Sequence, residues 1–261
     1  MGAISRDQAQ QGGTRKAPDL RPTGCEREIA SRVDDRDWDA TRSDLNAYGA
    51  APIGKLLSPG ECSELTALYD DENRFRSRIV MARHGFGRGE YKYFAYPLPE
   101  TVAGLRAALD ARLAEIANAW SERMRAAERY PPTLDGFLRR CHEAGQAKPT
   151  PLLLKYVAGD FNSLHQDLYG EIAFPIQVVI LLSEPGRDFT GGEFVLTEQR
   201  PRMHSRAEVV SLSQGEAVAF AVYDRPVDGA KGTYRVNMRH GVSRMQSGQR
   251  HTLGAIFHDA K

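Results

Sequence analysis

The stretch FPIQVVILLSEPGRDFTGGEFVLT, residues 174–197, decides the fold class of this chain. Two runs rich in Val, Ile, Leu and Phe, at 174–182 and 193–197, flank a connection that contains Pro, Gly and Asp. Short β-branched and aromatic runs bounded by turn-forming residues are typical of strands. We therefore predict two strands joined by a loop over these residues.

Runs of the same kind occur on both sides of this stretch, from Pro149 to near the last residue. They are LLLKYV (152–157), LHQDL (164–168), AEVVSL (207–212), EAVAFAV (216–222), RVNMRHGVSR (235–244) and HTLGAIFH (251–258). About eight strands without a long helix between them favour a sandwich or jelly roll over a parallel α/β sheet.

Helical patterns dominate the residues before Pro149. Ser58-Pro59-Gly60-Glu61 has the residues of a helix start, because Ser58 can cap the Glu61 amide and proline needs no amide partner at the first helical position. Apolar side chains recur every three or four residues over 102–124 and predict a long helix with one apolar face. A shorter helix is expected over residues 133–141.

The sequence thus predicts an α+β protein, with helical support over residues 56–142 and a β core over residues 150–259. Two β-like pieces, 78–82 and 91–96, surround a glycine-rich turn within the first part. Residues 1–35 are polar and show no sustained apolar period, so we expect a flexible tail there, with a helical segment that can begin near Glu26.

Composition excludes several classes of protein. The 261 residues are 41% hydrophobic and 26% charged, which is ordinary for a globular protein, and a net charge of +1 gives no overall attraction to nucleic acid or anionic membranes. No apolar run is long enough to cross a bilayer, and the polar N-terminus lacks a signal-peptide core, so we expect a cytoplasmic protein without a membrane partner. Three scattered cysteines, Cys25, Cys62 and Cys141, argue against a disulfide framework and a zinc finger.

The residues that suggest chemistry begin with Leu164-His165-Gln166-Asp167-Leu168. Side chains at positions i and i+2 of a strand leave the same face, so His165 and Asp167 can converge on one metal ion. A second histidine would complete a two-histidine, one-carboxylate site that leaves positions open for a bidentate co-substrate and dioxygen. An HxD pair alone is a weak indication, because any strand can contain one by chance.

Two further residues downstream strengthen this hypothesis. His240 begins a strand-like segment, and Arg250 follows ten residues later. A strand, a turn and a second strand of this total length bring the chain back beside His240. A buried guanidinium needs an anionic partner, and the far carboxylate of 2-oxoglutarate fits a bidentate contact. Thr252 shares the face of Arg250 and can donate its hydroxyl to the same carboxylate.

This order of residues resembles the Fe(II)/2-oxoglutarate dioxygenase superfamily, whose fold is a double-stranded β-helix. Thr190-Gly191-Gly192-Glu193-Phe194 resembles the GGE segment of prolyl-4-hydroxylase-like members. Tyr156, nine residues before His165, resembles the tyrosine that contacts 2-oxoglutarate in AlkB-type dealkylases. Leu154 stands where those enzymes have asparagine, and their longer His-to-Arg gap and second arginine are not matched.

A closer resemblance, strongest over the C-terminal two-fifths, is to a bacterial family of predicted oxygenases described as acting on alkylated DNA. It implies a dioxygenase domain over residues 36–261 that binds Fe(II), 2-oxoglutarate and dioxygen and hydroxylates a C–H bond, with oxidative dealkylation of damaged nucleic acid as its reaction. The implied metal and catalytic residues are His165, Asp167 and His240. The implied 2-oxoglutarate contacts are Arg250, Tyr156 and Thr252.

The substrate is open from the residues alone. A strip over 74–92 has interleaved aromatic rings and six basic residues, and it could bind DNA or RNA; the basic residues are Arg74, Arg76, Arg78, Arg83, Arg88 and Lys92. Arg200, Arg202 and Arg206 form a second basic cluster. The alternatives are a solvated edge hairpin, a prolyl-hydroxylase-like enzyme acting on a protein side chain or small metabolite, and a metal-binding jelly roll without activity. The full set of site residues argues against the last.

Overall fold

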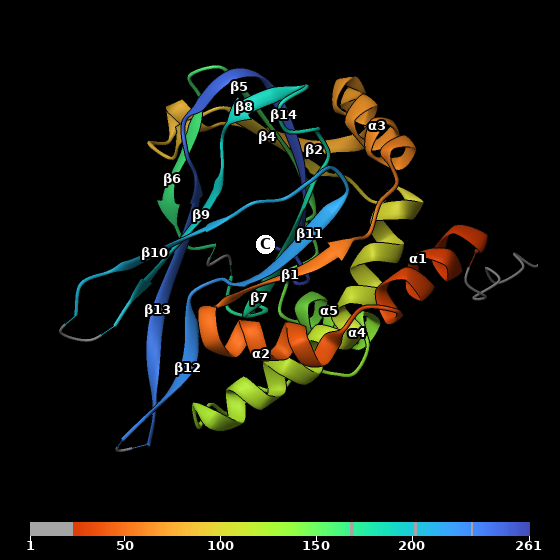
Figure 1. Cartoon of the computed structure of the whole chain (residues 1–261). Coiled ribbons are helices and arrows are strands. Elements are labelled where there is room, and N and C mark those ends of the chain that lie inside the picture. Colours follow the sequence, from red (N-terminus) through yellow and green to blue (C-terminus); the bar gives the residue numbers. More distant parts are fainter. Residues whose placement is uncertain (1–22, 168–169, 201–202, 231) are drawn as a thin grey trace, which may run out of the picture.

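The computed structural model describes residues 23–167, 170–200, 203–230 and 232–261. Two sheets face each other, as Figure 1 shows. The larger, called the major sheet, runs in the spatial order β1 (Ala50–Lys55), β11 (Glu216–Ala221), β7 (Ile176–Leu181), β14 (Met245–Ala255), β5 (Leu152–Val157), β4 (Glu90–Phe94) and β2 (Phe75–Val80), with β8 (Phe189–Gly191) also beside β14.

The smaller, called the minor sheet, has six strands. Its spatial order is β10 (Arg206–Val210), β9 (Phe194–Gln199), β13 (Gly232–Val242), β6 (Phe161–His165) and β3 (Gly87–Arg88), with β12 (Asp224–Gly229) beside β13. All pairings between these strands in the described ranges are antiparallel. Two facing antiparallel sheets agree with the predicted jelly roll.

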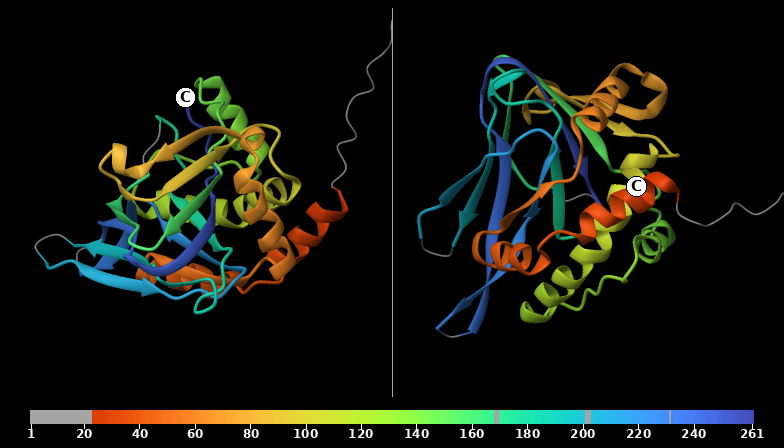
Figure 2. Two further views of the ribbon diagram at one scale, coloured as in Figure 1. Left: turned by 90° about the horizontal axis from the view of Figure 1, so that it is seen from above. Right: turned by 45° about the vertical axis from the view of Figure 1, so that its right-hand side comes forward.

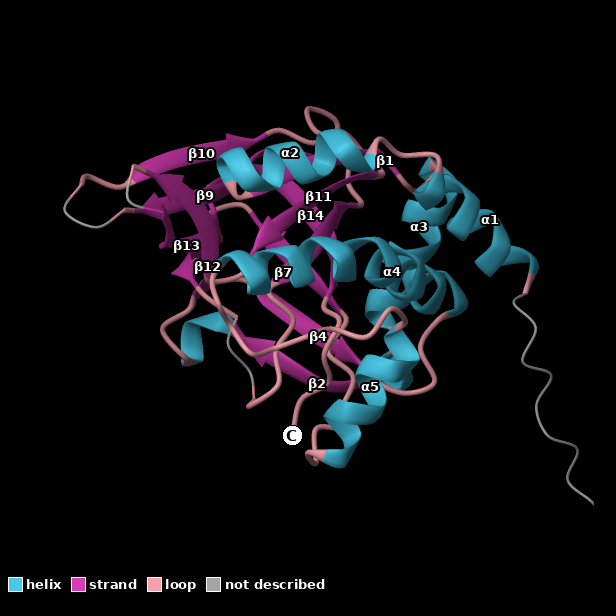
Figure 3. Cartoon of the chain, turned by 90° about the horizontal axis from the view of Figure 1, so that it is seen from below, coloured by secondary structure: helices cyan, strands magenta, loops and turns pink. Residues whose placement is uncertain are grey.

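Five α-helices of the described ranges pack around the outer side of the major sheet (Figures 2 and 3), and two of them, α2 and α4, also contact β12 of the minor sheet. They are α1 (Gly24–Asp34), α2 (Trp38–Tyr48), α3 (Pro59–Ala67), α4 (Glu100–Arg123) and α5 (Leu134–Glu143). Side chains between these helices and the sheet form the main hydrophobic core. The helices therefore stabilise the outer face of the major sheet, and its inner face remains available for a site.

Two predicted helices form for the reasons that their sequences indicate. Ser58 and Glu61 make both hydrogen bonds of a capping box at the start of α3, with Pro59 in the first turn. The apolar positions of α4 are buried, including Leu109 and Trp120. Their burial on one face fixes the helix against the rest of the fold.

Other parts differ from the prediction. Residues 24–34 form α1, as the helical segment expected near Glu26 predicts, but this helix is not part of a flexible tail, because its Ile29 and Val33 are buried against α4. The remaining tail residues, 1–22, lie outside the described ranges. Helix α2 and strand β12 were not predicted.

Among the described residues, no helix has both the length and the apolar character that crossing a bilayer requires.

Candidate metal centre

His165 and His240 are brought together by the minor sheet. They lie opposite each other in the register of β6 and β13, with ring centroids 4.2 Å apart. The register slips between His240 and Val242, so a bulge turns the chain beside the site. Gly241 permits this close approach, because a Cβ there would lie 2.6 Å from the carbonyl oxygen of Asn162.

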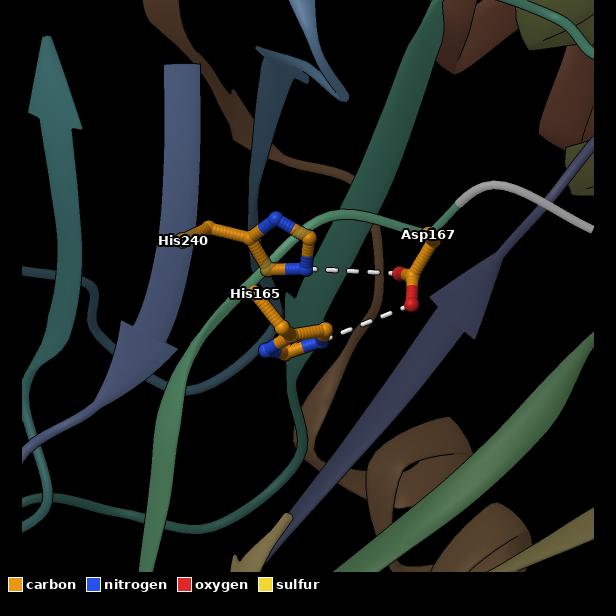
Figure 4. Close-up of side chains that lie close together, drawn as sticks. All are labelled: His165, Asp167 and His240. Carbon is orange, nitrogen blue, oxygen red and sulfur yellow. Dashed lines mark ion pairs between the residues drawn. The ribbon is translucent and has the colours of Figure 1, made fainter. Parts of the chain in front are cut away.

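Asp167 does not reach the site as the sequence predicted. Strand β6 ends at His165, so the strand expected over 164–168 is wrong for Gln166 and Asp167, which lie in the connection that follows. Leu168 lies outside the described residues. The alternation of a strand therefore does not explain the convergence of His165 and Asp167. The chain turns after His165 and directs the carboxylate toward both imidazoles (Figure 4).

The three side chains form a compact donor set. The Nε2 atom of His165 lies 3.4 Å from Asp167 Oδ1, and the Nε2 atom of His240 lies 3.3 Å from Asp167 Oδ2. One ligand atom from each residue lies within 4.8 Å of the others. Asp167 and His240 are buried, and His165 is partly exposed. Two imidazole nitrogens and one carboxylate, with open positions beside them, fit a non-haem Fe(II) ion.

Neighbouring groups prepare these donors for a metal. His165 Nδ1 lies 2.8 Å from the carbonyl oxygen of Ser163, a contact in which a protonated Nδ1 donates and which directs Nε2 toward Asp167. Burial alone would raise the pKa of Asp167, but hydrogen bonds from both histidines hold it well below its usual range. Burial lowers the pKa of His240, which favours its neutral, ligating form. Burial also disfavours charged His165, but Asp167 raises its pKa overall.

Arg250 on β14 is the second unusual group. It is 3% exposed, and in the described part of the chain its Nη1 atom has no hydrogen-bond partner. No carboxylate of the described residues forms an ion pair with it. Burial lowers the pKa of Arg250 to about 10, so the side chain stays charged near neutral pH. The rings of Tyr156 and Phe189 lie 5.8 Å and 5.9 Å from the guanidinium, but a buried cation without an anionic partner is costly, and its retention suggests an anionic ligand.

The residues around Arg250 leave room for such a ligand. Tyr156 faces Arg250 across the β5–β14 pairing, and its buried hydroxyl also lacks a partner among the described residues. Position 192, next to Arg250, requires glycine. Its φ is +68°, and a Cβ there would lie 2.3 Å from the sulfur of Met245 and 3.3 Å from Arg250 Cδ. The GGE segment thus contributes to the packing around the guanidinium.

One cavity of about 240 Å³ between the two sheets contains all six predicted site residues. It is lined by the three candidate metal ligands, by Arg250, Tyr156 and Thr252, and by apolar and aromatic side chains. Gln177 of β7 also lines it, and sequence analysis missed this residue. The side chain is buried, and its Nε2 atom has no partner within the described residues. A glutamine inside the apolar run IQVVIL was the available signal.

The basic strip is largely neutralised. Arg74 pairs with Asp71, Arg78 with Glu90, and the buried Lys92 with Glu72, so one acidic residue within the strip and two just before it oppose its charge. Arg76 donates to the Pro149 carbonyl oxygen and lies over the Tyr93 ring. The two remaining basic residues, Arg83 and Arg88, are exposed.

The second basic cluster surrounds one acidic group. Arg200 and Arg206 both pair with Glu198, which also pairs with the buried Arg225. Arg202 lies outside the described residues. These ion pairs give Arg200 and Arg206 a structural role in the minor sheet.

Comparisons with known proteins agree with this description. Solved structures with the same fold include a Pseudomonas putida prolyl-4-hydroxylase, with a TM-score of 0.50, 16% identity and coverage of 86% of this chain and 100% of the other. A Trichoplax adhaerens prolyl hydroxylase in complex with a peptide gives a TM-score of 0.52 and 13% identity, over 91% and 94% of the two chains. These similarities confirm the predicted jelly roll.

The sequence comparisons are more specific. An uncharacterized protein of Mycobacterium tuberculosis, found in two strains, is 47% identical over 167 residues, which are 64% of this chain and 72% of the relative. Residues 89–260 match the model of a family described as an oxygenase that catalyses oxidative methylation of damaged DNA. The matched region includes the histidine pair, Asp167 and Arg250. The chain belongs to this oxygenase family and is an oxidoreductase.

Proposed function

We propose that this chain is an Fe(II)- and 2-oxoglutarate-dependent dioxygenase. In this proposal His165, Asp167 and His240 hold the iron, and Arg250 binds the carboxylate of 2-oxoglutarate that is remote from the metal. The observation that supports it best is the presence, in one cavity, of a two-histidine, one-carboxylate set and a buried arginine without an ion-pair partner.

With iron, 2-oxoglutarate and dioxygen bound, the reaction inserts oxygen into a substrate C–H bond and releases succinate and carbon dioxide. The protein's own residues orient and protect the reactants. Ser163 fixes the ring of His165 through its carbonyl oxygen. The apolar lining of the cavity excludes water around the reacting groups.

Three side chains are available to hold the co-substrate. The Arg250 guanidinium supplies charge and a two-pronged set of donors, which suits a carboxylate. The hydroxyls of Tyr156 and Thr252 line the same cavity and can donate to the same molecule. Leu154, which also lines it, offers no amide donor, whereas the unpartnered Nε2 atom of Gln177 is a further donor within the cavity.

As substrate we propose an alkylated base in damaged nucleic acid, from which hydroxylation of the alkyl carbon removes the group. The family description supports this class of substrate. Exposed Arg83 and Arg88 lie on the loop that contains Phe86, a cavity-lining residue, where they can contact phosphates. Hydroxylation of a protein side chain is the second candidate, favoured by the segment Gly191-Gly192-Glu193 beside Arg250.

Succinate release separates these candidates. The full chain, with Fe(II) and 2-oxoglutarate in air, is given methylated single-stranded DNA, methylated duplex DNA, proline-containing peptides or free amino acids. We expect methylated DNA to stimulate succinate release above the substrate-free rate. Stimulation by peptides alone would replace the nucleic-acid proposal with the protein-hydroxylase alternative.

A further inference from the structure

The loop between β2 and β4 presents two exposed aromatic rings, of which one lies at the cavity. Phe86 is 47% exposed and also lines the cavity that contains the candidate metal ligands. Its ring stacks on that of His84, with centroids 5.3 Å apart and planes inclined by 22°. Exposed apolar side chains beside a cavity often mark a binding site.

This pair of rings is attached firmly to the metal-binding strand. The amide of Ser163 on β6 donates to the Phe86 carbonyl oxygen at 2.8 Å, and the Phe86 amide donates to Met81 at 3.2 Å. The short strand β3 continues the attachment, because Gly87 pairs with Asn162. Gly87 has a φ of +131°, and a Cβ there would lie 2.4 Å from a backbone oxygen of β6. The loop is therefore positioned by the strand that ends in His165.

The chemistry around these rings fits a planar ligand with a charged backbone. Aromatic side chains stack on the faces of nucleobases whatever their sequence, whereas phosphates require cations. Arg83 and Arg88 are exposed on this same loop. Arg88 is 64% exposed at its side chain and has only a 3.9 Å contact with Asp160. Both cations are thus available to a phosphate.

We propose that Phe86 and His84 form a stacking platform that holds an unpaired nucleobase at the mouth of the cavity. This inference rests on the proposed function and narrows its substrate to single-stranded nucleic acid or to a base turned out of a duplex. A base within a duplex has no free face to stack on a protein ring, and its alkyl group cannot reach a metal inside the cavity. Single-stranded substrates therefore bind more tightly than duplexes of the same sequence.

The test uses the full chain with Fe(II) and 2-oxoglutarate, without oxygen, and a methylated single-stranded oligonucleotide. Binding is followed by fluorescence anisotropy, and stacking by quenching of 2-aminopurine that takes the place of the methylated base in a second oligonucleotide. Phe86→Leu keeps an apolar side chain but removes the aromatic face, and Phe86→Trp restores one. Phe161→Leu is the control, because Phe161 is an exposed phenylalanine on β6 that does not line the cavity.

Stacking is worth about 1–3 kcal/mol per base, so Phe86→Leu should weaken binding by roughly 5- to 150-fold. It should also abolish the quenching of 2-aminopurine, whereas Phe86→Trp keeps it and Phe161→Leu changes neither signal. Unchanged affinity and quenching in Phe86→Leu would overturn the platform and leave the dioxygenase proposal intact. If the wild-type protein binds no oligonucleotide and only peptides stimulate succinate release, the substrate is not a nucleic acid. That result would overturn both the stacking platform and the proposed class of substrate.

Discussion

Replacing Arg250 with methionine separates the function of this residue from its cost to the fold. Arg250→Met keeps the length of the side chain but removes the charge and all five donors. In the ligand-free protein the guanidinium is buried and has no ion-pair partner among the described residues. The substitution should therefore have opposite effects on co-substrate binding and on stability.

The loss of binding can be estimated from the contact that is removed. A hydrogen bond to a charged group contributes about 1.5–3 kcal/mol, and a bidentate contact has two. We therefore expect the 2-oxoglutarate dissociation constant to rise by at least about 100-fold.

The gain in stability follows from the burial of the charge. Burial lowers the pKa of Arg250 from its ordinary value to about 10, which corresponds to a destabilisation of the charged form by about 3 kcal/mol. Removing the charge should raise the free energy of unfolding of the ligand-free protein by up to that amount. For a chain of this size, each kcal/mol raises the Tm by roughly 2–4 °C.

Calorimetric titration of 2-oxoglutarate without oxygen, with the iron present, measures the first effect, and thermal unfolding without ligand measures the second. Arg244→Met is the matched control, because Arg244 is exposed in the turn between β13 and β14. An unchanged dissociation constant in Arg250→Met would refute the assignment of the co-substrate contact. A lower Tm would refute the inference that the buried charge lacks compensation.

Three further outcomes are expected. Asp167→Ala should lose most bound iron, measured by metal analysis, and all succinate release; full activity in this variant would remove Asp167 from the ligand set. Arg83→Gln combined with Arg88→Gln should weaken oligonucleotide binding and reduce by about 2 the slope of the logarithm of the binding constant against the logarithm of the salt concentration. An unchanged slope would show that neither residue contacts a phosphate. Asp110 on α4 is fully buried, neither carboxylate oxygen has a partner among the described residues, and burial raises its pKa to about 7. Because the pKa of Asp110 is higher in the folded than in the unfolded protein, the free energy of unfolding falls as the pH rises from about 4 to 7. Asp110→Asn should therefore stabilise the protein by up to about 4 kcal/mol above pH 7 and by little near pH 4. Chemical unfolding at both pH values measures this difference.

Features set by neighbours in sequence were predicted well. The helix start at Ser58 and the apolar face of α4 depend on residues three or four positions apart, which the sequence displays directly. A helical segment near Glu26 was predicted, but the packing of α1 against the domain was missed, because its two buried positions, Ile29 and Val33, are too few to make a sustained pattern. Helix α2 was missed although Asp37 and Gly49 provide its caps.

Features set by contacts across the sheets were predicted less well. The candidate ligands were named correctly as neighbours, but the reason given for Asp167 was wrong, because the chain leaves β6 at His165. The strip over 74–92 looked strongly basic, since its acidic partners Asp71 and Glu72 lie just before the strip or across the hairpin. Ion pairs of this kind depend on register, which composition does not reveal.

The central claim is that one iron ion binds among His165, Asp167 and His240, with 2-oxoglutarate extending from it to Arg250. The most direct measurement is a crystal structure of the full chain with Fe(II) and 2-oxoglutarate, grown without oxygen, with iron located by its anomalous scattering. The anomalous peak should lie within bonding distance of both histidine Nε2 atoms and the Asp167 carboxylate, with the remote carboxylate of 2-oxoglutarate on the guanidinium. Iron bound elsewhere, or imidazoles of His165 and His240 that do not share it, would contradict the account.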